Sequence, residues 1–331
     1  MADVVLREIS KSFGATKAVD TVTMEVPDGG FVVLLGPTGA GKTTTLRLIS
    51  GLERPDSGDI LIGGRSVVGD TPAQRNVAMV FQQYSLYPHM TVRENLAFPL
   101  RSPILKTPED RISAKVAEVA EVLHIGHKLD NKATALSGGE MQRVSIGRAL
   151  VRNPQIYLMD EPLSSLDAKL RADLRVELKR IQENLGATML YVTHDQIEAM
   201  TMATSIGVLH EGRLVQMAPP REIYENPVSL YVASRLGLPR INALPADIFA
   251  GAPGGAETIG LRPEHIRHGE GKPAQVDRVE HLGDQTRLHL TLDGHDIITL
   301  TDAETTLEPG DTIAVQPNNA LYFDATGARI A

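Results

Sequence analysis

The sequence contains no cysteine and comparatively few positive charges. Without cysteine, its 331 residues can form no disulfide, thiolate nucleophile or cysteine-based zinc site, which agrees with a reducing compartment. Lys and Arg total 33 against 41 Asp and Glu, and the formal net charge is -8. Because nucleic-acid binders usually present a basic face, we expect no nucleic acid among the partners.

Long hydrophobic runs are also missing. The longest, such as FVVLLG from Phe31, fall far short of the roughly 20 residues that a membrane helix needs. The N-terminal segment MADVVLREIS lacks a charged start followed by a long apolar run, so we expect no signal peptide. Any membrane association is therefore expected to come through a partner.

Five short apolar runs indicate a buried parallel sheet. They are FVVLL from Phe31, VAMVF from Val77, IYLMD from Ile156, TMLYV from Thr188 and SIGVL from Ser205. Several precede helical patterns, and runs buried on both faces that alternate with helices are typical of the α/β class. The chain length suggests about two domains.

Two helices are predicted from caps and periodicity. Thr107 is the expected cap of the first, followed by Pro108 and two acids. Its apolar face comprises Ile112, Val116, Val119 and Leu123. The second carries Leu170, Leu174, Leu178, Ile181 and Leu185 and is expected to stop at Gly186.

The pattern changes near Gly237–Ala246, where prolines and glycine predict a linker. Beyond it, Leu288, Leu290 and Leu292 share one face of an expected strand, and Arg287, His289 and Thr291 share the other. Turn signals recur at Gly283-Asp284, Asp293-Gly294 and Pro309-Gly310. We therefore predict an α/β domain over residues 1–236 and a small all-β barrel over residues 237–331.

A phosphate-binding loop is predicted directly after the first buried run. Gly36-Pro37-Thr38-Gly39-Ala40-Gly41-Lys42-Thr43 matches G-x-x-x-x-G-K-[ST] between a strand and a helix. Its glycines let backbone amides point at phosphate oxygens, and the helix N-terminus adds partial positive charge. Lys42 is expected on the β- and γ-phosphates of ATP, the Thr43 hydroxyl on Mg²⁺, and Thr44 within the same site.

Two acids end another apolar strand. Asp160 and Glu161 follow Ile156–Met159, and uncompensated carboxylates at a buried strand end are costly. Bound Mg²⁺ would offset that cost for Asp160, and Glu161 would be placed to accept a proton from the attacking water. Taken alone, a pair of solvated loop acids is a comparable interpretation; the upstream phosphate loop favours the functional one.

These motifs, together with LSGGE at Leu136–Glu140, resemble one family. The ordered set of phosphate loop, Gln82, LSGGE, acidic strand, SSLD at Ser164–Asp167 and Thr193-His194-Asp195 resembles that of ABC ATPases. The resemblance covers the whole chain and is greatest to carbohydrate-importer ATPases of the maltose and glycerol-phosphate type. It implies a RecA-like P-loop NTPase fold with a helical subdomain at about residues 86–153. It also implies an OB-like C-terminal domain, on the segments GLRPEHI from Gly260 and VEHLGDQTRLHL from Val279.

The resemblance assigns roles to residues that would otherwise be ordinary core or loop positions. Phe13 matches the aromatic residue that stacks on adenine, since a flat ring offers apolar area to a base. Gln82 matches the residue that senses Mg²⁺ and the attacking water, and His194 the histidine that contacts the γ-phosphate. Asp167 lies in the matching loop that crosses to a second subunit.

The signature segment implies a homodimer. By resemblance, Ser137, Gly138, Gly139 and Glu140 face the nucleotide on the partner's phosphate loop, and Ser137 and Gly139 bind its γ-phosphate. Two ATP molecules would then lie between head-to-tail subunits. Where the family usually has Gln, this chain has Glu140, which adds a carboxylate at the rim of the nucleotide site.

Further partners follow from the same resemblance. Two transmembrane permease subunits are expected to dock near Gln82–Arg93, a segment in which Tyr84, Leu86, Tyr87, Pro88 and Met90 are expected to be exposed together. A periplasmic or extracellular solute-binding protein would act indirectly. The β domain is expected either to receive a regulatory protein or to brace the dimer. The chain would lie on the cytoplasmic face of the inner membrane.

The sequence favours an ATPase that energises import of a carbohydrate, polyol, glycoside or glycerol phosphate. Polyamine and ferric-ion importers share the same type of C-terminal domain and stay open as alternatives. A non-transport ABC ATPase acting on DNA or ribosomes is disfavoured, because such proteins often fuse two cassettes or insert a coiled coil. This chain has one cassette and no long heptad region.

Overall fold

The computed structural model describes residues 2–102 and 107–330. The chain divides into two compact units, residues 1–220 and 221–331, which are described separately. The first unit contains a six-stranded sheet in the order β10-β9-β3-β8-β7-β6. Its strands are β3 (Phe31–Leu35), β6 (Val77–Val80), β7 (Ile156–Asp160), β8 (Met189–Thr193), β9 (Ser205–His210) and β10 (Arg213–Ala218).

The central strands of this sheet are parallel and fully enclosed. Every residue of β3, β7 and β8 is buried, and β6, β7, β8, β3 and β9 pair in parallel, with antiparallel β10 at one edge. The α/β prediction is therefore confirmed. Because parallel strands end at a common edge, the segments that follow β3, β7 and β8 converge there.

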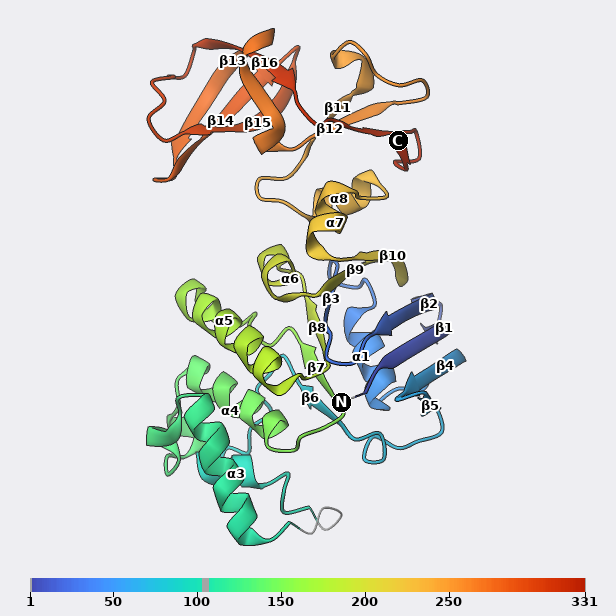
Figure 1. The fold of residues 1–331 in the computed structure, drawn as a ribbon, viewed down its shortest axis with the longest axis vertical. Helices are drawn as coiled ribbons and strands as arrows, with labels where there is room; N and C mark the ends of the chain where they lie inside the picture. The colour runs from blue at the N-terminus through green and yellow to red at the C-terminus, as the bar shows by residue number, and fades with distance from the viewer. Residues whose placement is uncertain (1, 103–106, 331) are drawn as a thin grey trace. The chain divides into compact units, whose positions relative to one another are not determined.

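A second, antiparallel sheet completes the first unit, in the order β2-β1-β4-β5. Its strands are β1 (Val4–Phe13), β2 (Thr16–Val26), β4 (Ser57–Ile62) and β5 (Arg65–Ser66). Helix α1 (Lys42–Ser50) lies between the two sheets, while α5 (Ala168–Leu185) and α6 (Gln196–Met202) cover the other face of the six-stranded sheet (Figure 1). Leu6, Ile49, Ile60 and Leu34 share the resulting core.

Helices inserted between β6 and β7 form the predicted helical region. They are α2 (Val92–Ala97), α3 (Glu109–Val122), η1 (Gly126–Lys128), η2 (Ala133–Ala135) and α4 (Gly138–Leu150). Gly147 permits close packing, since a Cβ there would lie 2.6 Å from Leu96 Cδ2. Fully buried Asn95 accepts a hydrogen bond from the Tyr87 backbone amide and donates one to the Tyr87 carbonyl.

The expected joint exposure of five residues of this loop is correct only for Pro88, since Tyr84, Leu86, Tyr87 and Met90 are half-buried. The ring centroid of Tyr87 lies 4.4 Å from that of Phe98 and 4.8 Å from the guanidinium carbon of Arg148. The ring packs the loop onto the helical region because Asn95 anchors the backbone there. Pro88 and His89 in the same segment are exposed.

Two details of the predicted helices differ from expectation. Pro108, in extended conformation, occupies the N-cap of α3 in place of Thr107 and makes no side-chain cap. Acids at Glu109 and Asp110 favour this helix start through its dipole instead. In α5 the buried stripe ends before Leu185, which is 45% exposed next to the left-handed turn at Gly186. Among the described residues, no helix is long and apolar enough to cross a bilayer.

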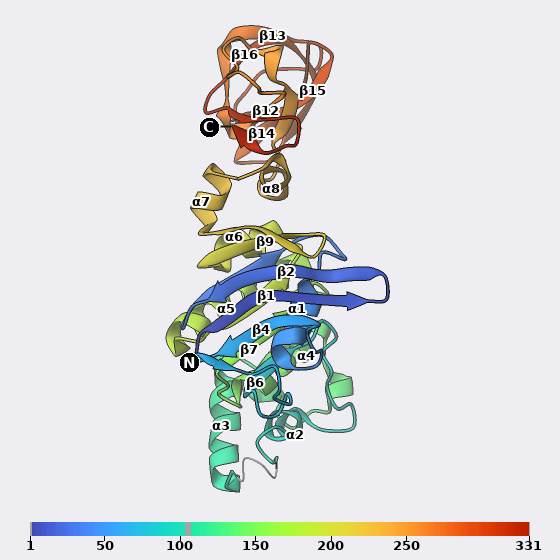
Figure 2. The same ribbon diagram turned by 90° about the vertical axis from the view of Figure 1, so that its right-hand side faces the viewer.

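The second unit is all-β after two short helices, α7 (Pro220–Glu225) and α8 (Leu230–Arg235). One antiparallel sheet has the order β11-β12-β17-β18, and the other β15-β14-β13-β16. Their strands are β11 (Asn242–Pro245), β12 (Thr258–Leu261), β13 (Ile266–His281), β14 (Gln285–Leu292), β15 (His295–Asp302), β16 (Thr312–Pro317), β17 (Leu321–Phe323) and β18 (Arg329–Ile330). Short helical turns lie at η3 (Ala246–Ile248) and η4 (Pro263–His265). Figure 2 shows the strands of both sheets.

The predicted alternation along β14 is confirmed. Leu288, Leu290 and Leu292 are buried, and they share one core with Ile259 and Leu261 of the other sheet. The segment expected to be a linker, Gly237–Ala246, is shorter than predicted, because Asn242–Pro245 pairs with β12 as a strand.

The helices α7 and α8 belong with the β unit because one buried guanidinium joins them to it. Arg262, after β12, donates hydrogen bonds to the carbonyl oxygens of Ala233, Leu236 and Tyr224, and its charge lies over the Tyr224 ring. The two compact units divide at residue 220, and the domain boundary at residue 236 stays a prediction.

Candidate active site

The phosphate-loop residues lie at the end of β3, where only glycine fits at two positions. A Cβ on Gly41 would lie 2.3 Å from the Ala18 carbonyl oxygen, and Gly41 also has φ +98°. A Cβ on Gly36 would lie 2.7 Å from the Leu209 carbonyl oxygen. Gly39 has φ +82° with open space around it. Residues 36–41 thus curl into the start of α1.

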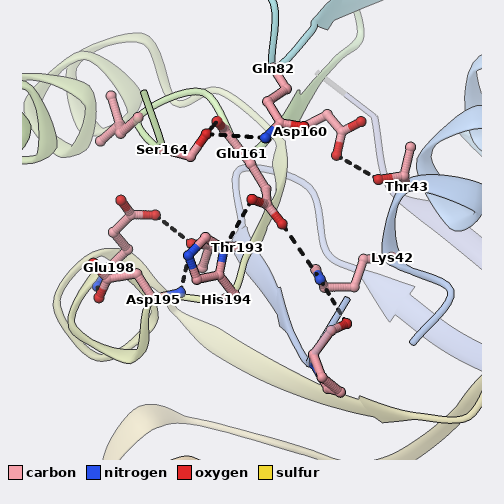
Figure 3. Close-up of polar contacts among 12 residues, drawn as sticks. Lys42, Thr43, Gln82, Asp160, Glu161, Ser164, Thr193, His194, Asp195 and Glu198 are labelled. Carbon is pink, nitrogen blue, oxygen red and sulfur yellow. Dashed lines mark hydrogen bonds and ion pairs between the residues drawn. The ribbon is translucent and has the colours of Figure 1, made fainter. Parts of the chain in front are cut away.

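Lys42, the first residue of α1, folds back over this loop. Its ammonium donates hydrogen bonds to the carbonyl oxygens of Gly36 (3.0 Å) and Pro37 (3.1 Å). It also lies 3.5 Å from Glu161 Oε1, and the side chain is 5% exposed. A nearly buried positive charge is therefore held between the loop and an acid from another strand (Figure 3).

Thr43 and Asp160 meet although they are far apart in the sequence. The Thr43 hydroxyl donates to Asp160 Oδ1 at 2.9 Å. Burial raises the pKa of the Asp160 carboxyl, and the neighbouring charge of Glu161 raises it further, while the Thr43 hydrogen bond opposes the shift. The ionised carboxylate is thus costly in this position and would be favoured by a bound cation.

Glu161 has an unusual backbone at the edge of the sheet. Its φ is +44°, in the left-handed region that non-glycine residues rarely adopt. Its carboxylate lies between the Lys42 ammonium and His194, whose Nδ1 is 2.9 Å from Glu161 Oε2. The Glu161 carboxylate thus links the start of α1 to the turn that follows β8.

Hydrogen bonds to buried Glu198 stabilise the turn that carries His194. Buried Glu198 accepts hydrogen bonds from the hydroxyls of Thr193 (2.6 Å) and Tyr191 (2.9 Å). Burial raises the pKa of the Glu198 carboxyl, which the two hydroxyl donors oppose. Asp195 caps α6 by accepting from the backbone amide of Ile197. The His194 imidazole is itself 61% exposed and directed at Glu161 (Figure 3).

Gln82 reaches the same acids through a serine. Its amide nitrogen donates to Ser164 Oγ at 3.5 Å, and Ser164 Oγ donates to the Glu161 carbonyl oxygen at 2.9 Å. In the same loop, Ser165 Oγ lies 3.0 Å from the Tyr84 hydroxyl. Asp167 ends this loop and caps α5, accepting from the amide of Leu170.

The signature residues form a helix start with a full capping box. Ser137 caps α4 and accepts from the Glu140 amide, while the Glu140 carboxylate accepts from the Ser137 amide at 2.8 Å. Lys128 Nζ lies 3.0 Å from Glu140 Oε1. The Ser137 amide, and then the Lys128 ammonium and the Ser137 hydroxyl, lower the pKa of Glu140. Gly139 packs tightly, since a Cβ there would overlap the Leu170 side chain.

The structure brings only some of the predicted site residues into contact. Glu161 contacts both Lys42 and His194, and Thr43 contacts Asp160. Gln82 is linked to the Glu161 carbonyl through Ser164. The polar contacts of Ser137 and Glu140 are with each other and with Lys128. Phe13 ends β1 and is 47% exposed, with the Lys11 ammonium 5.3 Å from its ring centroid.

Sequence reasoning missed four polar residues that support these groups. Ser164 and Arg171 flank the predicted Asp167, Glu198 follows His194 by one helical turn, and Lys128 pairs with Glu140. Arg171 and Glu198 lie one helical turn after the predicted helix caps Asp167 and Asp195, and this spacing could have indicated them. Lys128 left no local signal.

The site and fold define a class: a P-loop nucleotide-binding protein with an all-β C-terminal unit. Residues 19–164 match the ABC transporter family, and residues 259–321 match the TOBE domain. The sn-glycerol-3-phosphate import ATP-binding protein UgpC of a Ruegeria species is 44% identical over 352 residues, covering both chains completely.

Solved structures of ABC ATP-binding cassettes have the same fold as the first unit. The structure of cbiO1 from Clostridium perfringens, part of the ABC transporter complex cbiONQ, aligns with a TM-score of 0.63 at 26% identity. It covers 67% of this chain and 90% of that one. A dimeric post-hydrolysis state of the ATP-binding cassette MJ0796 with ADP and Pi aligns at 0.59 with 30% identity, covering 66% and 99%. The chain belongs to the ABC transporter ATP-binding proteins and is an ATPase.

Proposed function

We propose that this ATPase energises an importer for glycerol phosphate or a related carbohydrate. The observation that carries the proposal is the meeting of Lys42, Thr43, Asp160, Glu161 and His194 at one edge of the sheet. The cargo rests on the full-length similarity to an sn-glycerol-3-phosphate import protein. The chain would lie at the cytoplasmic face of the membrane, held there by permease subunits.

The proposed chemistry is transfer of the γ-phosphoryl group of ATP to water. Lys42 would exchange its loop carbonyls for phosphate oxygens, because a charged oxygen is the stronger acceptor. Glu161 would accept the proton of the attacking water, and the Nδ1 contact would hold His194 beside the γ-phosphate. Gln82, held through Ser164, would contact the water and the metal. Phe13 would stack on adenine.

The residues at the phosphate loop fit Mg²⁺. Thr43 and Asp160 offer hard oxygen ligands, and the raised pKa of buried Asp160 marks a carboxylate that would gain from a cation. Among the residues described, no cluster of three or more His, Cys, Asp or Glu forms a ready metal cage. Mg²⁺ usually needs only one or two carboxylates beside phosphate oxygens and water. When bound, it would neutralise charge that develops on the phosphates.

The proposed working form is a homodimer. Ser137, Gly138, Gly139 and Glu140 would face the nucleotide of the partner subunit, and Asp167 would lie in the crossing loop. The exposed position of Ser137 at the N-terminus of α4 supports this, because helix N-termini favour anions.

The proposed permease contact is a surface at residues 82–93 that continues into two adjoining cavities. They have volumes of about 630 and 230 Å³ and share Met79, Phe81, Pro99 and Arg152. Phe81 is 37% and Phe98 44% exposed, which leaves aromatic area open at these cavities. Apolar and aromatic area of this kind is enriched in the cores of protein interfaces.

The proposal is tested by reconstitution with the candidate permease and binding protein. Addition of glycerol 3-phosphate or sugars should stimulate ATP hydrolysis for one class of solute. His89→Glu should leave the ATPase activity of the free subunit unchanged but weaken co-purification with the permease, because His89 is exposed beside the surface. His295→Glu, at the exposed first residue of β15 in the second unit, is the matched control. Normal co-purification and transport by His89→Glu would place docking elsewhere; no stimulation by these solutes would exclude the cargo.

A further inference from the structure

One arginine of α5 holds the loop that follows the catalytic acids. The Arg171 guanidinium donates from Nε to the carbonyl oxygen of Leu163 (3.3 Å). It also donates from one terminal nitrogen to the carbonyl oxygens of Leu166 (2.8 Å) and Ser164 (3.5 Å). A guanidinium is a rigid planar fork of donors, so these three carbonyls are held in a fixed relation to α5. A lysine ammonium could not reproduce this pattern.

The other terminal nitrogen of Arg171 faces the histidine turn. It lies 3.7 Å from Asp195 Oδ2, directly after His194 in the chain. Asp195 is well anchored, since its amide donates to Thr193 Oγ1 at 3.0 Å and its Oδ1 accepts from the Ile197 amide at 2.7 Å. An ion pair, too long for a hydrogen bond, therefore links the guanidinium to the turn that carries His194.

The loop held by Arg171 also touches the reacting groups. Ser164 donates to the Glu161 carbonyl oxygen and accepts from Gln82, and Ser165 contacts Tyr84. In the proposed dimer, this loop leads into Asp167 at the crossing between subunits. It is thus the segment of the described chain that meets both the catalytic acids and the proposed partner.

We infer that Arg171 is a positioning residue that couples this loop to His194. Through Asp195, the guanidinium ties the loop at residues 163–166 to the turn of His194 and keeps His194 in its 2.9 Å contact with Glu161 when two subunits associate. The inference rests on the proposed roles of His194 and the dimer. Its competitor is a purely structural role, in which Arg171 only ties α5 to the preceding loop.

The partial exposure of the ion pair between Arg171 and Asp195 allows the two roles to be distinguished by experiment. The side chains of Arg171 and Asp195 are 32% and 23% exposed, and ion pairs open to solvent contribute little to stability. Loss of the pair in Asp195→Asn should therefore leave the melting temperature nearly unchanged while the turnover rate falls. Arg171→Met also loses its bonds to three loop carbonyls, so the melting-temperature comparison is made on Asp195→Asn. If the pair were purely structural, its loss would lower the melting temperature and leave the turnover rate of the folded protein nearly unchanged.

The experiment measures ATP hydrolysis by the full-length chain in six variants. Arg171→Met removes the whole link, whereas Asp195→Asn removes only the charge and keeps the cap, because Asn and Asp cap helices equally well. The double variant closes a mutant cycle. Lys179→Met, which removes a comparable pair with Glu183 on the same helix, is the matched control.

We expect each single variant to lower kcat by about 10- to 100-fold, the scale on which small misplacements act. KM for ATP should stay within about twofold, because neither side chain is proposed to touch the nucleotide. The double variant should be no slower than the slower single one. Arg171→Lys should recover little, since it cannot hold three carbonyls and a carboxylate together.

Several outcomes would overturn the inference. These are a normal kcat in Asp195→Asn, additive losses in the double variant, or losses that follow a fall in melting temperature. His194→Ala serves as the reference for the proposed function. If His194→Ala is slow while Asp195→Asn is normal, only the coupling fails; if His194→Ala is as fast as wild type, the role proposed for His194 fails instead.

Discussion

At the residue scale, Glu161 has a left-handed backbone conformation and a carboxylate that contacts two side chains. Its left-handed backbone, at a cost of order 1–3 kcal/mol for such conformations, aims the carboxylate between the Lys42 ammonium and the His194 imidazole. Nine other non-glycine residues of the described chain also have positive φ. The contacts with Lys42 and His194, and not the backbone conformation, therefore support a role for Glu161 at the reacting phosphate.

Replacement of this carboxylate tests that role. Glu161→Gln preserves shape but cannot accept a proton, so hydrolysis should slow by about 10²- to 10⁴-fold, with ATP affinity retained. Rate and affinity are measured separately, by phosphate release and nucleotide titration. Glu183→Gln, an exposed carboxylate on α5, is the control and should behave like wild type. Near-normal turnover in Glu161→Gln would remove this residue from the role of base.

Glu198 supplies a pH-dependent test of the histidine turn. Burial raises its pKa above that of the unfolded chain, so the fold favours the protonated form. Its contribution to stability is largest at acid pH and falls as the pH rises through the unfolded and then the folded pKa. Glu198→Gln keeps an acceptor for the Thr193 and Tyr191 hydroxyls and removes this fall.

The melting temperature of Glu198→Gln should therefore rise relative to wild type between acid and neutral pH. Glu198→Ala should lose stability at every pH, at about 1–3 kcal/mol for each hydroxyl left unpaired. Both are measured as thermal unfolding curves over a pH series. Parallel curves for wild type and Glu198→Gln would show that the Glu198 charge carries no such cost.

At the element scale, the phosphate loop shows how tightly a turn can be specified. Gly39 and Gly41 both have positive φ, but only Gly41 is also pressed against a backbone carbonyl, that of Ala18. Side-chain atoms can rotate away from an added methyl group, whereas a β-strand backbone cannot. The two glycines therefore form a natural matched pair.

Gly41→Ala should be far more damaging than Gly39→Ala. At Gly39 the added methyl meets open space, so the cost is the left-handed strain alone, about 1–2 kcal/mol. At Gly41 the start of α1 must move, which should also abolish ATP binding. Urea unfolding and nucleotide titration of both variants provide the comparison. Equal losses would show that strain, and not the close approach, governs the loop.

At the scale of the whole molecule, the proposed site is completed by a second copy. Each subunit would then offer its phosphate loop on one side and the start of α4 on the other. ATP would favour the closed pair because it binds that state more tightly. Glu140, paired with Lys128, would lie at the rim of this interface.

Association should accordingly depend on ATP. Glu161→Gln, which retains ATP, should sediment as a dimer with nucleotide and shift towards monomer without it. Adding Ser137→Arg should abolish the shift, because a bulky cation would occupy the contact proposed for the partner's γ-phosphate. Ser113→Arg, on the exposed face of α3, is the control. Unchanged ATP-driven association in the Ser137 variant would contradict the shared site.

The sequence by itself determined the fold class and the chemistry of the phosphate loop. Strand runs and the G-x-x-x-x-G-K-T pattern are local, since each depends on neighbours within one turn or one strand. The apolar character of β3, β7 and β8 predicted a buried parallel sheet, whereas their order in it came from the structure. Local patterns also misled: Tyr87 looked like surface, and Asn242–Pro245 looked like linker.

Only the tertiary structure decided which side chains meet. Thr43 and Asp160 are separated by 117 positions, and Glu161 and His194 by 33, yet parallel strands deliver them to one edge. Arg171 contacts three carbonyls of residues 163–166 and the carboxylate of Asp195. It reaches both because α5 lies beside the loop after β7 and the turn after β8. Such contacts depend on the packing of distant segments, and no sequence period encodes them.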